Sequence, residues 1–228
     1  MTKNAPSICI KAQSNHNALF LILLASILFM LTLVLSQHYW RQFHLVLTFI
    51  YLAELVVFIT GLAKYFQPQF SLTLTPSYLK YQHRYGQWQL SWQDIQRISL
   101  MNETLGVNPL QLPFIGIRLT AIATLATSIS PRLANRLIHE QRPLLAMAIR
   151  LRLITLEQSQ LNFSPFILAN GEIIKGPLAA FLHHSSILHN ALGYHLFIPE
   201  SALDRQLNEF CVLLNQCKQS ARHYIYPN

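Results

Sequence analysis

The sequence predicts an α+β protein that begins with a transmembrane helix hairpin. Two long apolar runs, residues 18–36 and 45–66, are each long enough to cross a hydrocarbon core of ~30 Å as a helix. The residues that follow alternate apolar and polar side chains, as the strands of an antiparallel sheet do. Later segments carry helix-start signals. These three observations predict a helix pair in the membrane and a separate domain of strands and helices.

The two apolar runs differ in their polar content. Residues 18–36 contain no charge, whereas residues 45–66 contain Glu54 near the middle and Lys64 near the end. The link Gln37–His44 includes two aromatic residues and one arginine, which are typical of the membrane–water interface. Because this link is too short for a domain, we expect the two helices to cross the membrane in opposite directions.

Basic residues near the ends of the runs predict the orientation. Lysines precede the first run and follow the second, against Arg41 alone in the link, and cytoplasmic segments carry the excess of Lys and Arg. We therefore expect two spans with both termini in the cytoplasm, and a disordered tail over residues 1–17. A cleaved signal peptide is the alternative for the first run, but residues 33–37 lack an Ala-x-Ala pattern.

Composition and charge limit the choice of partners. The 228 residues are 52% hydrophobic and carry a net charge of +8. Once the hairpin is set apart, about 160 residues remain, which is enough to bury a core. The basic balance favours anionic lipid or nucleic acid, and the membrane segment makes lipid the better expectation. Three cysteines without Cys-x-x-Cys spacing predict neither a disulfide framework nor a zinc site.

Strand signals begin directly after the second apolar run. Phe70–Thr75 alternates apolar and polar residues, and residues 78–85 continue the pattern in a second strand. Gly86 marks a tight turn, after which residues 88–92 form the return strand. The alternation changes phase before Ile95, which predicts a bulge or a short turn.

The run Leu72–Ile98 (LTLTPSYLKYQHRYGQWQLSWQDIQRI) resembles the opening of bacterial pleckstrin-homology-like (PH-like) domains. In those domains a strand pair, a Gly turn and a Trp-x-x-Ile segment lead into the next strand, and one or two membrane spans commonly come first. The whole layout resembles an uncharacterised family of two-span bacterial inner-membrane proteins, a domain of unknown function. The resemblance implies a bent antiparallel sheet with capping helices, located at the inner membrane, which binds or scaffolds without catalysis. It implies no site residues.

Further elements are predicted in the remainder of the chain. Phe114–Thr120 alternates as a strand, and Ser130 before Pro131 is a helix start in which a capping side chain precedes proline at the first helical position. Residues 177–192 form an amphipathic pattern, and residues 201–216 predict a terminal helix.

A weak internal repeat suggests the domain organisation. Residues 154–163 match residues 72–81 at several positions, and both halves end in a helix. We therefore predict two tandem PH-like units, 67–150 and 151–228. A single domain with a helical insertion is the alternative, and one continuous sheet built from both halves would reject the duplication.

Glu54 is the strongest candidate site, because an ionisable side chain at mid-bilayer is costly and usually has a purpose. If the helices pair antiparallel about a turn centred near Trp40, Ser26 or Ile27 lies opposite Glu54, and Ser26 can donate a hydrogen bond to it. We expect structural pairing of Glu54, within the hairpin or between two copies of the chain. Contact with a partner protein or with lipid is the alternative.

A second candidate is a basic helical face. Arg132, Arg136 and His139 lie at positions i, i+4 and i+7 of one helix, and such a face can rest on anionic headgroups. A solvated face on which Glu140 is a local partner is the simpler interpretation. The candidate headgroup contacts are Lys64, Arg132, Arg136, His139 and Arg142.

The sequence predicts no metal site, no cofactor and no catalytic activity. His184 and His189 are five residues apart, not the four that align two metal ligands on a helix. Serine-hydrolase, zinc-protease and phosphate-loop motifs are all missing from the sequence. We expect a membrane protein whose cytoplasmic PH-like domain binds a protein partner. A sensor of anionic lipid is the alternative, a membrane-bound enzyme is the lesser alternative, and nucleic acid is not expected.

Overall fold

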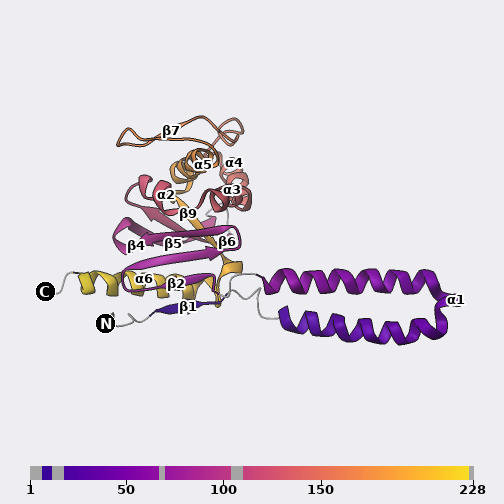
Figure 1. The fold of residues 1–228 in the computed structure, drawn as a ribbon. Coiled ribbons are helices and arrows are strands. Elements are labelled where there is room, and N and C mark those ends of the chain that lie inside the picture. Colours follow the sequence, from indigo (N-terminus) through magenta and orange to yellow (C-terminus); the bar gives the residue numbers. More distant parts are fainter. Residues whose placement is uncertain (1–6, 12–17, 67–69, 104–109, 226–228) are drawn as a thin grey trace. The chain divides into compact units, whose positions relative to one another are not determined.

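The computed structural model describes residues 7–11, 18–66, 70–103 and 110–225. The chain divides into two compact units: one comprises residues 12–69, and the other combines the residues before this segment with those after it. The second unit contains antiparallel sheets and several helices (Figure 1). The predicted α+β class is therefore confirmed.

The first unit consists of α1 (Ala18–Tyr65), a long apolar helix interrupted at Phe43, where the backbone is non-helical (φ −125°, ψ 27°). The parts before and after Phe43 run side by side in opposite directions (Figure 1). The rings of Phe29 and Tyr51, one from each part, meet edge to face with centroids 5.6 Å apart. The break falls in the polar link between the two apolar runs, although helical residues extend through most of that link.

The two parts of α1 contact each other along residues spaced seven apart. The buried residues are Ala18, Ala25 and Thr32 before the break and Leu47, Glu54 and Gly61 after it. Seven-residue spacing keeps one side of a helix facing its neighbour. A Cβ atom added to Gly61 would lie 2.9 Å from Ile22 Cγ1 and 3.1 Å from the Ile22 backbone nitrogen. The two backbones therefore approach closely, as they do where small residues pack between membrane helices.

The second unit begins with a four-stranded antiparallel sheet. Its strands, in spatial order, are β1 (Ile8–Ile10), β2 (Leu72–Leu74), β3 (Tyr78–His83) and β4 (Gly86–Ser91). β1 pairs with β2, with Ile8 opposite Leu74. The prediction of a disordered tail is therefore wrong for residues 8–10, because Ile10 is buried in the core and the strand hydrogen-bonds to β2. Residues 1–6 and 12–17 of that tail lie outside the described residues.

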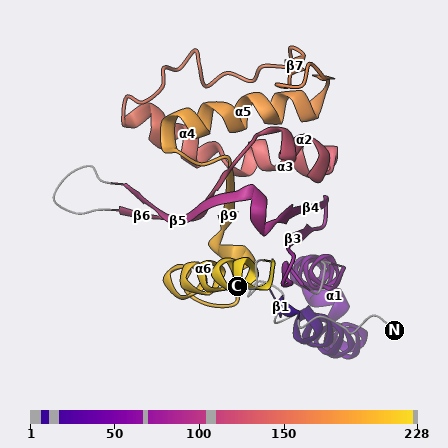
Figure 2. The same ribbon diagram turned by 90° about the vertical axis from the view of Figure 1, so that its left-hand side faces the viewer.

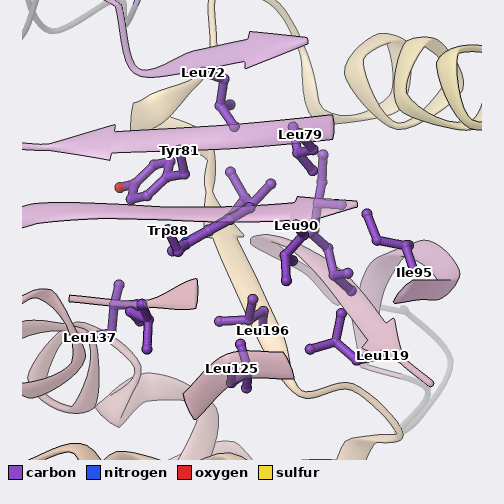
Figure 3. Close-up of a cluster of buried hydrophobic side chains, with 14 of the residues drawn as sticks. Leu72, Leu79, Tyr81, Trp88, Leu90, Ile95, Leu119, Leu125, Leu137 and Leu196 are labelled. Carbon is purple, nitrogen blue, oxygen red and sulfur yellow. The ribbon is translucent and has the colours of Figure 1, made fainter. Parts of the chain in front are cut away.

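The predicted alternation is confirmed within β3 and β4, although β3 ends at His83 and Tyr85 is exposed in the turn that follows. The inward side chains are Leu79, Tyr81, Trp88 and Leu90 (Figure 3). Gly86, at the start of β4, has φ +139°, a conformation that side chains rarely allow. The residues Trp92–Asp94 form a 3₁₀ turn and the pairing register shifts after Ile95, so the predicted bulge or short turn is also confirmed.

A second sheet joins the two halves of the domain. It contains β5 (Ile95–Glu103), β6 (Leu110–Leu119) and β9 (Leu196–Pro199), in that order. β9 pairs with β6, with Ile198 opposite Ile115. Because one sheet takes strands from both halves, the predicted division into units 67–150 and 151–228 is wrong. The single domain with a helical insertion describes the fold.

The insertion lies between β6 and β9. It contains α2 (Ala123–Ser128), α3 (Pro131–Glu140), α4 (Arg142–Arg150), the short pair β7 (Phe166–Ile167) and β8 (Ile173–Ile174), and α5 (Pro177–Leu192). These helices cover one side of the sheets, and α6 (Leu207–Ile225) covers the other (Figure 2). Lys218 of α6 donates a 2.6 Å hydrogen bond from Nζ to the Gln96 carbonyl oxygen of β5. The main core lies between these layers (Figure 3).

Candidate functional site

Glu54 is held inside α1 by the contact between the two helical parts. The residue is 7% exposed, and its Oε1 accepts a 2.6 Å hydrogen bond from Thr32 Oγ1. The second carboxyl oxygen, Oε2, is buried and has no hydrogen-bond partner among the described residues. Ser26, the predicted donor, instead donates to the Ile22 carbonyl oxygen at 2.8 Å. Within one chain the pair is therefore Thr32–Glu54, not Ser26–Glu54.

The register differs from the prediction because the turn is centred at Phe43 rather than Trp40. In an antiparallel helix pair, facing residues are about equally distant from the turn. Thr32 and Glu54 each lie 11 residues from Phe43 in the sequence. Moving the centre by three residues changes the expected partner by nearly two helical turns. The sequence signal that identifies Thr32 is the seven-residue spacing of small residues before the break.

A groove of about 350 Å³ runs beside Glu54 on α1. Its walls are mostly apolar and combine residues from both helical parts. The lining residues are Ala25, Ser26, Phe29, Met30, Tyr51, Glu54, Leu55 and Phe58. The phenol of Tyr51 donates to Ser36 Oγ at 3.2 Å. The groove therefore combines an apolar wall with the exposed hydroxyl of Ser26 and the carboxyl of Glu54.

Only part of the predicted basic face of α3 is free to contact anionic headgroups. Arg136 Nε donates a 2.7 Å hydrogen bond to Glu140 Oε1, and the guanidinium lies 5.5 Å from the centre of the Tyr85 ring. Arg136 is thus held by its own helix and by a neighbouring aromatic ring. The remaining predicted contacts of this domain, Arg132, His139 and Arg142, are exposed. Lys64 lies in the last turn of α1, in the other unit.

Sequence reasoning missed an apolar surface between α4 and α5. The connecting segment consists mainly of turns and irregular backbone, apart from β7 and β8, and it runs over the outer side of α5 (Figures 1 and 2). Six large apolar side chains along it are between 43% and 71% exposed. We name these residues the 153–173 surface: Leu153, Leu156, Leu161, Phe163, Ile167 and Ile173.

Basic side chains are more numerous than acidic ones around the 153–173 surface. Leu161 shares a shallow pocket of about 300 Å³ with Arg142, at the start of α4. The exposed charged residues of this region are Arg142, Arg150, Arg152 and Lys175 on the basic side and Glu157 and Glu172 on the acidic side. The surface therefore combines apolar area with a modest positive charge.

Two histidines of the second half, His184 and His195, are buried in the domain interior. The imidazoles of His189 and His195 stack with ring centres 3.8 Å apart, and His195 Nδ1 accepts a hydrogen bond from the Leu119 backbone N–H at 3.1 Å. Burial, with smaller contributions from His189 and Arg118, lowers the pKa of His195 to about 4. Burial also lowers the pKa of His184 to about 4. No group of three or more potential metal ligands occurs among the described residues.

A family model described as "Protein of unknown function (DUF2982)" matches residues 72–220. The match covers well over half of the 228 residues. It runs from β2 into α6 and contains both sheets except β1. No curated protein and no solved structure matches the chain.

Proposed function

The chain belongs to the DUF2982 family of proteins of unknown function, and we propose that it is an integral membrane protein whose cytoplasmic domain binds a protein partner. The observation that carries this proposal is the 153–173 surface, six large apolar side chains left exposed along one segment of the described domain. In this role α1 holds the domain at the membrane and the 153–173 surface contacts the partner.

Two properties of α1 support a membrane location. The helix is long and apolar enough to cross a membrane, and only 17% of its most apolar window is buried within the structure. Apart from Leu47, the residues buried in the contact between the helical parts are small or polar, while most large apolar residues face outward. A helix pair in water places its large apolar residues inside and its polar residues outside. Outward apolar side chains, as in α1, are suited to lipid as the solvent.

Chain connectivity supports two crossings instead of one. β1, just before α1, pairs with β2, just after it, so the chain leaves and returns at neighbouring strands. A straight helix of 48 residues extends roughly 72 Å and would separate those strands. We therefore propose spans at residues 18–36 and 45–66 of a bacterial inner membrane. The excess of basic residues outside the link supports a cytoplasmic location for both termini.

The PH-like character of the domain is part of the same proposal. It is supported by the β3–β4 pair at Gly86, by the 3₁₀ turn that precedes β5, and by α6 packed against β5. Domains of this kind bind or scaffold, so we propose a binding role without catalysis.

Photo-crosslinking tests the protein-partner proposal. A photoreactive amino acid replaces Phe163 or Leu156 in the full-length protein, and cells are irradiated before membranes are isolated. We expect one discrete adduct with another protein from both positions. The matched control is position 220, because Ser220 is exposed on α6, away from the segment. Failure to form an adduct at positions 156 and 163, or the same adduct from position 220, would contradict the proposal.

Anionic lipid is the second candidate, and the exposed basic residues Arg132, Arg142 and Arg152 favour it. Each basic residue near an anionic surface contributes about 1 kcal/mol. A spin label at Phe163→Cys in full-length protein, with the native cysteines replaced, reports contact with the bilayer. Burial of the label in anionic proteoliposomes, reduced by Arg142→Glu and Arg152→Glu, supports lipid binding. A label that stays in water in neutral and anionic vesicles alike excludes lipid at this surface.

A further inference from the structure

Half of the Glu54 carboxyl group is unsatisfied within one chain. Oε1 accepts a hydrogen bond from Thr32, but Oε2 has no partner among the described residues. The side chain is buried, with only 7% of its surface exposed. In lipid no water is present to replace the missing hydrogen bond, and an unpaired polar group there is strongly unfavourable. The arrangement therefore calls for a partner that approaches from outside the helix pair.

The groove beside Glu54 limits what that partner can be. Its walls include Phe29, Met30, Leu55 and Phe58, so the occupant must be apolar. It must also bring a hydrogen-bonding group within reach of Glu54 Oε2. A lipid acyl chain meets the first condition but offers no donor or acceptor, whereas a membrane helix with a polar side chain meets both.

A second copy of the chain meets both conditions. The same groove contains Glu54 and Ser26, which is exposed and satisfied only by the Ile22 carbonyl of its own helix. A serine hydroxyl rotates readily toward another acceptor. In a two-fold dimer one surface meets itself, so a residue i that contacts j in the partner is matched by j contacting i. A surface that holds both the acceptor and the donor is therefore self-complementary.

From this geometry we propose that α1 dimerises in the membrane through the Glu54 groove, with Ser26 of each copy donating to Oε2 of the other copy's Glu54. The Glu54 side chain must turn toward the groove, because Oε2 is buried in the single chain. The proposal rests on the proposed function in one respect, that α1 spans a membrane.

Disulfide crosslinking in native membranes tests the dimer. Cys9, Cys211 and Cys217 are replaced in the full-length protein, and a single cysteine is introduced at Met30→Cys or at Ile27→Cys. Both positions are 66% exposed, but only Met30 lines the groove. We expect oxidation to give covalent dimers at position 30 at least roughly fivefold more efficiently than at position 27. Equal crosslinking at the two positions would show random collision and overturn the proposal.

Side-chain variants in the Met30→Cys background test the hydrogen bond. Ser26→Ala is expected to reduce the dimer roughly three- to tenfold, since interhelical hydrogen bonds in membranes are modest. Ser26→Thr keeps the hydroxyl and is expected to retain the dimer. An unchanged dimer in Ser26→Ala contradicts the assignment of the donor. An adduct of position 30 with a different protein shows that the occupant is not a second copy.

The same samples separate this inference from the proposed function. Membranes are washed with alkaline carbonate before oxidation. Protein that is released by the wash contradicts the membrane location of α1, and with it both proposals. Protein that resists the wash but gives no dimer at position 30 contradicts only the dimer.

Discussion

Thr32 and Glu54 are joined by a 2.6 Å hydrogen bond, although 22 residues separate them in the sequence. In a straight helix that separation corresponds to roughly 33 Å, so the break at Phe43 is what brings the hydroxyl to the carboxyl. The same register places Gly61 against Ile22. One contact therefore defines which residues of α1 face each other and which face outward.

Loss of the Thr32 hydroxyl is expected to weaken α1. Thr32→Val keeps the side-chain shape but leaves Glu54 without a donor, and we expect a loss of about 1 kcal/mol in the stability of the helix pair. Thr32→Ser retains the hydroxyl and is the matched control. The thermal unfolding midpoint of each detergent-solubilised variant is measured, with size-exclusion chromatography as the readout of folded protein. Equal midpoints for the two variants would show that the hydrogen bond has no stabilising role.

A larger residue at position 61 is expected to separate the two parts of α1. In Gly61→Val the Cβ atom meets Ile22 Cγ1 at 2.9 Å. The two backbones must therefore move apart, and the contact between the two helical parts loses packing. Ala63→Val adds comparable bulk two residues away, at an exposed position. We expect a lower thermal midpoint and a lower monodisperse yield for Gly61→Val alone. Similar losses in both variants would contradict the close approach at Gly61.

The stability of the domain is expected to fall on mild acidification. Burial lowers the pKa of His184 and of His195 to about 4 in the folded state, against about 6.5 in an unfolded chain. Between these values the unfolded state binds more protons, so stability decreases as the pH falls through this window and levels off below pH 4. Each histidine lowers the unfolding free energy by at most about 2 kcal/mol when the pH falls from 7 to 5.

The variant His195→Asn provides the test of this pH dependence. The Asn side-chain oxygen can accept the Leu119 N–H in place of His195 Nδ1, but it does not titrate. We expect the difference in unfolding free energy between pH 7 and pH 5 to be smaller than in the wild type, measured by urea unfolding in detergent. An identical pH dependence would exclude His195 as a contributor.

Ser130 precedes α3, yet its side chain does not cap the helix. Its Oγ is buried and has no hydrogen-bond partner in the described part of the chain, and it forms no capping hydrogen bond. We therefore expect Ser130→Ala to change the unfolding free energy by less than about 0.5 kcal/mol, whereas a capping serine contributes about 1 kcal/mol. Thr75→Val is the contrast, because Thr75 Oγ1 accepts the Tyr78 N–H at 3.0 Å. A larger loss in Ser130→Ala than in Thr75→Val would contradict this description.

Local patterns predicted much of the fold. The alternation around Trp88 and Leu90 identified the buried face of β3 and β4, because side chains on a strand alternate strictly between two faces. The residues Pro177–Leu192 were predicted with the observed bounds. In both cases the determining interactions lie within a few residues of each other.

Long-range relationships were not readable from the same patterns. The pairing of β9 with β6 joins residues about 80 apart in the sequence. No local pattern around Leu196 indicates which strand it pairs with. β1 is only three residues long and gains its order from β2. The partner of Glu54 depended on the exact position of one helix break, so an error of three residues exchanged Thr32 for Ser26.

The 153–173 surface could not be predicted because exposure is a property of the folded chain. Apolar residues such as Leu156 and Phe163 resemble core positions in sequence, and only the irregular backbone of their segment leaves them uncovered.

Cysteine accessibility across α1 is the most direct test of its double crossing. One variant keeps Cys9, which is exposed in β1, as its only cysteine. A second variant carries only Arg41→Cys, in the link between the two apolar runs. Right-side-out and inside-out vesicles are treated with a membrane-impermeant maleimide. We predict that Cys9 is labelled only in inside-out vesicles and the cysteine at position 41 only in right-side-out vesicles. Labelling of both cysteines from the same side would contradict two spans.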